Sequence, residues 1–105
     1  MTENEYSIGY RPEAMEDVTN ILINYKMLSG VQGAKRMMKK LQSAIERLST
    51  QPYIGMVYPD PKLSSMKLRR LVVDKYLIFY RVFEEERYVE IYRVVNGTTN
   101  FMQLF

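Results

Sequence analysis

Three runs of β-branched and aromatic residues stand close together in the C-terminal half of the chain, and they constrain its fold more than any other feature. They span residues 67–73, 76–83 and 88–95, and each has the length of an ordinary strand. The connectors, residues 74–75 and 84–87, are short enough for β-hairpins. The sequence therefore predicts a three-stranded antiparallel meander.

Alternation within the middle run predicts which side chains share a face of this sheet. One face carries Tyr76, Ile78, Tyr80 and Val82, and the other carries Leu77, Phe79, Arg81 and Phe83. One of the two faces must be core. We expect Arg81 to lie at the edge of the core or to pair with a carboxylate such as Glu90 across the hairpin, and we expect the same of Arg93.

Two stretches before the meander have the apolar spacing of amphipathic helices. The first begins at Pro12, has carboxylates in its first turns and ends at Ser29-Gly30. Its predicted buried face holds Ala14, Val18, Ile21, Leu22, Tyr25 and Leu28. The second helix is barred from continuing by Pro52, and its apolar positions are Ala34, Met37, Met38, Leu41, Ala44, Ile45 and Leu48. Joined by residues 29–33, the two helices form a hairpin whose apolar side must pack against other elements.

Shorter segments complete the predicted fold. Residues 6–10 alternate large and small side chains as a short strand does, whereas residues 51–65, with three prolines and Gly55, predict an irregular loop. Asn96-Gly97 turns the chain into an apolar tail that would dock on the domain or on a partner. We therefore predict an α+β fold, in which an N-terminal strand and a two-helix hairpin pack on a three- to four-stranded, mainly antiparallel sheet. The 105 residues fit a single domain over residues 1–105.

The composition excludes several kinds of chemistry and of chain. Because the chain has no cysteine and no histidine, thiolate nucleophiles, Ser-His triads and metal centres built on these residues are excluded, and we expect no metal and no cofactor. The 47% hydrophobic and 26% charged content excludes a disordered tail or a coiled-coil rod. No apolar run approaches the roughly 20 residues that span a bilayer, and the acidic start is unlike a signal peptide. We expect a cytoplasmic protein that does not bind membranes.

Positive charge is concentrated in the middle of the chain. Residues 34–75 hold ten basic and three acidic side chains, although the net charge of the whole chain is only +3. Such a stretch is a candidate surface for nucleic acid or for an acidic protein. The cluster Lys35, Arg36, Lys39 and Lys40 also fits the solvated side of a helix. Arg69 and Arg70 lie in a strand pattern, where a charged pair is less expected, and this favours a functional role for them.

Local patterns in the same order resemble those of a known superfamily. They are Tyr10-Arg11-Pro12-Glu13-Ala14 with Asp17 and Ile21, then Ala34, Leu48, Pro52 and Gly55, and the dense runs 68–82 and 90–97. Together they cover nearly the whole chain, which resembles the RelE/ParE superfamily of bacterial type II toxins. The resemblance implies a co-encoded antitoxin protein that wraps the hairpin and the sheet. We expect this partner to contact Lys35, Arg36, Lys39, Lys40, Phe101, Leu104 and Phe105.

The branch of the superfamily is indicated by two short patterns. Members that resemble RelE cleave messenger RNA on the ribosome and usually carry an arginine where this chain has Leu77. Members that resemble ParE have an apolar residue there, followed by Ile-Phe-Tyr-Arg, as in residues 78–81. Their last strand ends in Arg-Val-Leu-His-Gly with a later Asp, but this chain has Asn96 and Asn100 at those two positions. The resemblance to ParE implies a toxin that poisons DNA gyrase by binding.

The alternative is a toxin that cleaves messenger RNA on the ribosome. Its catalytic residues would be Arg70, Arg69, Lys75 and Tyr80, with the arginines stabilising the pentavalent phosphorane and Tyr76 or Tyr80 relaying a proton. Arginine cannot be the general base, so Lys67, Lys75, Glu46 or a tyrosine would need a shifted pKa. Arg70 is the strongest functional candidate. A member of the superfamily with neither activity is a third reading.

Overall fold

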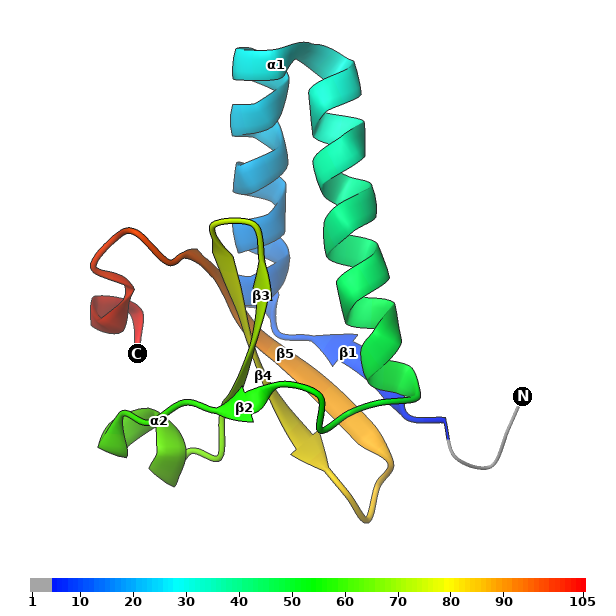
Figure 1. Cartoon of the computed structure of the whole chain (residues 1–105), viewed down its shortest axis with the longest axis vertical. Helices are drawn as coiled ribbons and strands as arrows, with labels where there is room; N and C mark the ends of the chain where they lie inside the picture. The colour runs from blue at the N-terminus through cyan, green and yellow to red at the C-terminus, as the bar shows by residue number, and fades with distance from the viewer. Residues whose placement is uncertain (1–4) are drawn as a thin grey trace.

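A computed structural model describes residues 5–105, in which a helical hairpin packs against a twisted sheet (Figure 1). The elements in chain order are β1 (Ser7–Tyr10), α1 (Pro12–Glu46), a 3-10 turn (Arg47–Ser49), β2 (Met56–Val57), α2 (Pro61–Ser65), β3 (Arg69–Val73), β4 (Tyr76–Phe83), β5 (Tyr88–Asn96) and a last 3-10 turn (Phe101–Leu104). Residues 1–4, which make up most of the acidic start, lie outside the described residues. None of the helices in residues 5–105 is both long enough and apolar enough to cross a membrane.

The helical hairpin is one element, α1, bent sharply at Gly30. Gly30 has φ 74° and ψ −177°, a conformation that glycine adopts far more easily than other residues. The bend divides α1 into a first arm, residues 12–29, and a second arm, residues 31–46, which run antiparallel. The predicted hairpin is therefore confirmed, but the predicted linker 29–33 was too long. Residues 31–33 remain helical because one residue with positive φ is enough to reverse the chain.

The sheet has five strands in the order β1-β5-β4-β3-β2. Strands β2 to β5 pair antiparallel, so the meander is confirmed, whereas β1 pairs with β5 in parallel. The prediction of three to four strands missed β2, which lies in the segment expected to be an irregular loop. That segment also contains α2, which begins at Pro61 because the Asp60 carboxylate accepts hydrogen bonds from the amides of Lys62 and Leu63.

The start of β3 also differs from the prediction by two residues. Lys67 has φ 59°, and the amide of Leu68 donates to the Leu63 carbonyl at the end of α2. These two residues therefore terminate α2, and the strand begins at Arg69.

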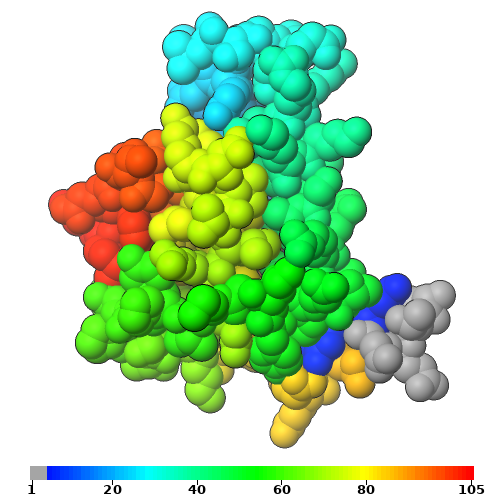
Figure 2. All heavy atoms as spheres, viewed as in Figure 1, coloured from blue at the N-terminus to red at the C-terminus, as the bar shows by residue number. Residues whose placement is uncertain are grey.

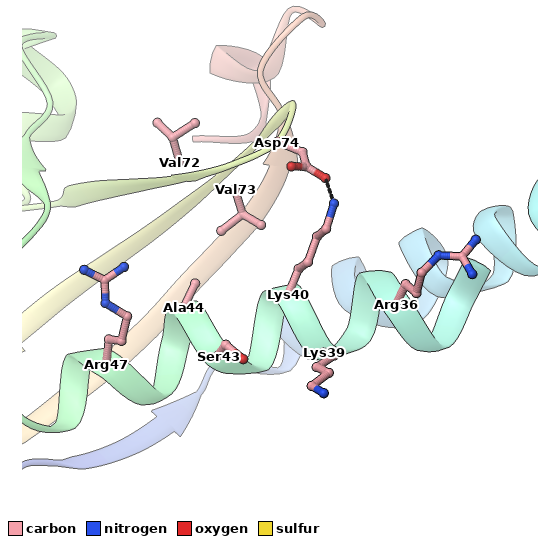
Figure 3. Close-up of a pocket in the computed structure, with 9 residues that line it drawn as sticks. All are labelled: Arg36, Lys39, Lys40, Ser43, Ala44, Arg47, Val72, Val73 and Asp74. Carbon is pink, nitrogen blue, oxygen red and sulfur yellow. Dashed lines mark hydrogen bonds and ion pairs between the residues drawn. The ribbon is translucent and has the colours of Figure 1, made fainter. Parts of the chain in front are cut away.

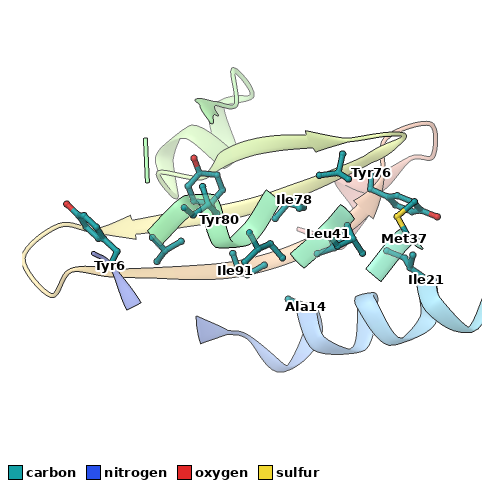
Figure 4. Packing of buried hydrophobic residues seen from close by; sticks show 14 residues of the cluster. Tyr6, Ala14, Ile21, Met37, Leu41, Tyr76, Ile78, Tyr80 and Ile91 are labelled. Atoms are coloured by element: carbon teal, nitrogen blue, oxygen red, sulfur yellow. The ribbon is translucent and has the colours of Figure 1, made fainter. Parts of the chain in front are cut away.

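One core lies between the sheet and the hairpin (Figure 4). The β4 side chains Tyr76, Ile78 and Tyr80 share one face, as their alternation predicts, and the structure shows that this face points toward α1. They pack against buried side chains of both arms, namely Ile21, Met37, Leu41 and Ile45. Leu28, expected on the same buried face, is instead 86% exposed. The hairpin extends past the end of the sheet, so the sheet does not cover its last turns.

A second core lies on the opposite face of β4. Leu77 and Phe79 are buried there with Leu63, Leu68, Val95 and Phe101. The rings of Phe101 and Phe105 lie 5.6 and 5.0 Å from the ring of Phe79. Of the two expected positions for the C-terminal tail, on the domain or on a partner, the structure has the first. Strand β4 is therefore buried on both faces.

An ion pair joins the first arm to β5. The Asp17 carboxylate accepts hydrogen bonds from Arg93 Nε and Nη2, at 2.8 and 2.9 Å, and from the amide of Val94 at 2.9 Å. These hydrogen bonds to Asp17 raise the pKa of Arg93. Arg93 thus pairs with a carboxylate, the second of its two expected arrangements, but the partner comes from α1 and not from across the β-hairpin.

Arg81 lies at the edge of the core, the first of its two expected positions. It stands opposite Glu90 in the register of β4 and β5, but no ion pair joins the two side chains among the described residues. Its guanidinium carbon instead lies 4.5 Å from the centre of the Phe83 ring, and its Nε is buried without a hydrogen-bond partner.

Candidate functional site

Gly55 is held between two of the residues proposed for catalysis, Arg69 and Tyr80. Arg69 Nη1 donates to the Gly55 carbonyl at 2.7 Å, and the Gly55 amide donates to Tyr80 Oη at 2.8 Å. A Cβ on Gly55 would lie 2.4 Å from the Arg70 carbonyl oxygen and 2.6 Å from Tyr80 Oη. Only glycine lets the loop approach β3 and β4 this closely. The arrangement fixes the loop and restricts both side chains.

Tyr80 is enclosed in the core. Its exposed fraction is 0%, and burial raises its pKa although the Gly55 amide and Arg69 act in the opposite direction. A buried phenol that keeps its proton cannot act as a general base near neutral pH. Tyr76, the other tyrosine considered for proton transfer, is also buried, and burial raises its pKa as well.

The remaining catalytic candidates lie apart from Tyr80. Arg70 stacks on the ring of Tyr58, with its guanidinium carbon 5.3 Å from the ring centre. Lys75 lies at the β3–β4 turn, next to the paired residues Val73 and Tyr76. Arg69, which stands opposite Tyr80, lies four residues before Val73 along β3. At about 3.3 Å per residue, this separation is about 13 Å. The four side chains therefore do not converge on one scissile bond.

The two other candidate bases, Glu46 and Lys67, are both exposed. Glu46 is the last residue of α1, and Lys67 follows α2. Among residues 5–105, no three acidic side chains come close enough together to hold a metal ion.

A basic cleft of about 600 Å³ lies where the second arm meets β3 (Figure 3). Its charged lining consists of Arg36, Lys39, Lys40, Arg47 and Asp74. Lys40 Nζ donates to Asp74 at 3.0 Å. The other three cations have no ion-pair partner among the described residues. Of the four basic residues expected to bind a partner, three line this cleft, and Lys35 is exposed on the same arm outside it.

Beside the cleft, part of the edge of β3 is free. Strand β2 pairs only with Arg69 and Arg70, so residues 71–73 have no strand on that side within the chain described. Val72 is exposed there. A free strand edge presents unpaired backbone amides and carbonyls, which can bind an extended peptide as an added strand.

A second groove, mainly apolar, runs between the two arms. It encloses about 290 Å³ and is lined from the first arm by Met15, Val18 and Leu22, among others. Met38, predicted to be buried, lies in this groove and is substantially exposed. The arms diverge slightly here, which leaves side chains of both arms open to solvent.

The C-terminal tail contributes mostly to the core. Phe101 is buried and Phe105 packs on Phe79, whereas Leu104 is about half exposed. The role of these three residues in binding a partner stays a prediction.

Sequence reasoning missed a cluster of polar side chains at the opposite end of β4 from Lys75. The Glu84 carboxylate accepts hydrogen bonds from the hydroxyls of both Tyr6 and Tyr53. The hydrogen bond to Glu84 raises the pKa of Tyr53 to about 12, and the same contacts lower the pKa of Glu84. Arg69 stacks on Tyr53 with its guanidinium carbon 4.8 Å from the ring centre. No local sequence pattern predicts this cluster, because its members come from three segments that are far apart in the chain.

Comparisons with known proteins agree with this architecture. A family model described as the ParE toxin of type II toxin-antitoxin system, parDE, matches residues 8–101. The fold is similar to a structure of the chromosomal ParDE system from P. aeruginosa, with a TM-score of 0.72 and 17% identity over 90% of this chain and 98% of that chain. It is also similar to the RelBE2 toxin-antitoxin complex from Mycobacterium tuberculosis, with a TM-score of 0.66 and 18% identity over 88% of this chain and 98% of that chain. A search of curated proteins found no match.

Proposed function

Because the chain belongs to the ParE toxin family of type II toxin-antitoxin systems, we propose that it arrests growth by binding and poisoning DNA gyrase. The observation that carries this proposal is the failure of the candidate catalytic side chains to converge. Tyr80 is fully buried and bonded to Gly55, while Lys75 lies at the other end of the β3–β4 hairpin. General acid–base catalysis requires both groups within hydrogen-bond reach of the same substrate. The surfaces that remain accessible are suited to binding.

Cleavage of messenger RNA is the alternative that the experiment must separate from this proposal. Arg70 is partly exposed on β3 and could stabilise a phosphorane. However, Arg70 packs on Tyr58, and arginine cannot supply the base. A nuclease would thus need a catalytic base brought in by the ribosome or by the substrate itself.

The test uses the purified toxin and the variant Arg70→Ala with two targets. We expect both proteins to trap gyrase on supercoiled plasmid and to give linear DNA after denaturation. We expect neither to cut messenger RNA on translating ribosomes. Codon-specific cuts by the wild type that fall roughly 100-fold in Arg70→Ala, without linear plasmid, would establish the nuclease and refute the gyrase proposal.

We further propose that a co-encoded antitoxin holds the toxin inactive by laying an extended acidic segment along the basic cleft. The charge of the cleft supports an acidic partner, since Arg36, Lys39 and Arg47 have no ion-pair partner among the described residues. The free edge at residues 71–73 supports an extended conformation, because an added strand would continue the pairing that β2 begins. Carboxylates on the side of that strand facing α1 would then lie near the cations of the second arm.

A further inference from the structure

The bend of the helical hairpin carries exposed apolar side chains that the fold does not require. Leu28 is 86% and Met27 is 79% exposed, and Ile23 and Val31 are also exposed. We call these four residues the hairpin tip. Scattered exposed apolar residues are ordinary, but a group gathered at one place on a monomer commonly marks an interaction site.

Three residues of the hairpin tip, Met27, Leu28 and Val31, lie beyond the part of α1 that packs on the sheet, and Ile23 is exposed on the first arm. The outermost side chains of the arms that pack on the sheet are Tyr25, whose ring centre lies 6.5 Å from that of Tyr76, and Met37. The sheet ends at the β3–β4 turn, where Asp74 binds Lys40 on the second arm. Figure 2 shows the cyan end of the hairpin projecting past the rest of the molecule. Solvent-facing helix positions in such a place are normally polar, so folding does not explain the apolar side chains.

The turn that presents the hairpin tip is tight. Gly30 adopts the positive φ that reverses the chain, and a Cβ on Gly33 would lie 2.5 Å from the Cβ of Ser29. The residues on either side of the bend are therefore in close contact. A surface that is already ordered loses less conformational entropy on binding than a flexible loop does.

The charges around the hairpin tip define the kind of partner that it fits. Between Asp17 and Glu46 the chain contains no acidic residue. Lys26, Lys35 and Arg36, all exposed, stand near the bend. A second copy of the chain would bring the same positive charges together, so self-association through the tip is disfavoured. The matching surface is an apolar pocket with carboxylates at its rim.

The shape of the hairpin tip separates its partner from the one that fits the basic cleft. The cleft is concave and lies beside a free strand edge, so it suits an extended segment. The hairpin tip is convex and needs a concave partner, which only a folded protein provides. We propose that the hairpin tip inserts into an acidic-rimmed apolar pocket on gyrase, the target in the proposed function, on which this inference rests.

The experiment compares exposed apolar residues at two places. The double variant Met27→Ser/Leu28→Ser alters the tip, and Met56→Ser on β2, 73% exposed, is the matched control. We expect the double variant to bind gyrase about 10- to 100-fold more weakly and to lose linearisation of plasmid in parallel. The control should bind gyrase with an affinity within about twofold of the wild type, because it removes a similarly exposed apolar side chain that lies outside the tip. Both proteins should keep the thermal unfolding midpoint of the wild type and its affinity for the antitoxin.

A charge variant provides a second, independent measurement. Lys35→Glu should weaken gyrase binding most at low salt, because it reverses a charge near the tip. Lys62→Glu on α2 should have no such effect.

Each other outcome overturns a defined part of the reasoning. If the double variant and the wild type linearise plasmid equally, the tip proposal is wrong and the gyrase proposal stands. If the wild type does not bind gyrase at all, both proposals fail. If the double variant binds gyrase normally but loses binding to vesicles containing phosphatidylglycerol, the tip is a membrane contact and the protein-partner proposal is wrong.

Discussion

Among the glycines in the sheet and in the loops, Gly55 is the one whose replacement by alanine should destabilise the fold most. The new Cβ would lie 2.4 Å from the Arg70 carbonyl oxygen, and this oxygen belongs to the backbone of β3, which cannot rotate away. The loop would have to withdraw, and it would lose the hydrogen bonds that Gly55 makes with Tyr80 and with Arg69. Overpacking costs about 1–3 kcal/mol, and the two hydrogen bonds, one of them charged, contribute about 2 kcal/mol more. We expect a loss of about 3–5 kcal/mol.

Gly9→Ala is the matched control, because it has the larger overlap and the smaller expected cost. A Cβ on Gly9 would lie 2.0 Å from Tyr88 Oη. That oxygen is the far end of a side chain that is only partly buried and stacks on Phe83. Rotation of Tyr88 would relieve the overlap at the expense of the stacking, about 0.5–1.5 kcal/mol.

Thermal unfolding followed by circular dichroism distinguishes the two variants. In a domain of this size 1 kcal/mol corresponds to roughly 4–8 °C, so Gly55→Ala should lower the midpoint by roughly 12 °C or more. Gly9→Ala should lower it by roughly 2–12 °C. If the Gly9→Ala protein is less stable than the Gly55→Ala protein, the reasoning is refuted. The loss of stability would then depend on the size of the overlap and not on whether the overlapping atom belongs to the backbone.

Two further predictions concern ionisable groups. The pKa of Tyr53 is raised to about 12 by Glu84, so the stability that it contributes is complete below the ordinary pKa of 10.0 and is lost as the pH rises through about 12. Glu84, whose pKa is lowered from 4.5, contributes stability above that value and loses it as the pH falls. Urea unfolding at several pH values should therefore show both losses in the wild type and smaller ones in Tyr53→Phe, and identical pH profiles would contradict this. In the cleft, Lys39→Glu should weaken binding of the antitoxin, and co-expressed antitoxin should then rescue growth less well. Lys62→Glu should change neither. If the two variants bind the antitoxin equally well, the cleft is not the antitoxin site.

The local patterns of the sequence predicted most of the elements, because each pattern reflects burial of one face. Alternation placed Tyr76, Ile78 and Tyr80 on one face of β4, and they share the face that packs on the hairpin. The short strand β2 escaped prediction because two residues form a strand only through their pairing with β3. The parallel pairing of β1 with β5 could not be predicted either, since pairing between distant segments leaves no local signal in the sequence.

The candidate site was less predictable than the fold. The sequence grouped Arg69 with Tyr80, and the two are indeed paired across β3 and β4. It could not show that Tyr80 is buried in the core or that the Tyr80 hydroxyl accepts a hydrogen bond from the Gly55 amide. The exposure of Leu28 was also unpredictable, because helical periodicity does not reveal where the sheet beneath the helix ends.

The parallel pairing of β1 with β5 also constrains how the molecule is made. Strand β1 is synthesised early, but its partners, residues 88–91, follow only after most of the chain has been translated. Chains grow at roughly 5–20 residues per second, and pairing between distant segments is slow to form. Until β5 emerges, Asp17 also lacks the arginine that ties the first arm to the sheet. A nascent chain that ends before residue 88 can therefore form neither the complete sheet nor the anchored hairpin.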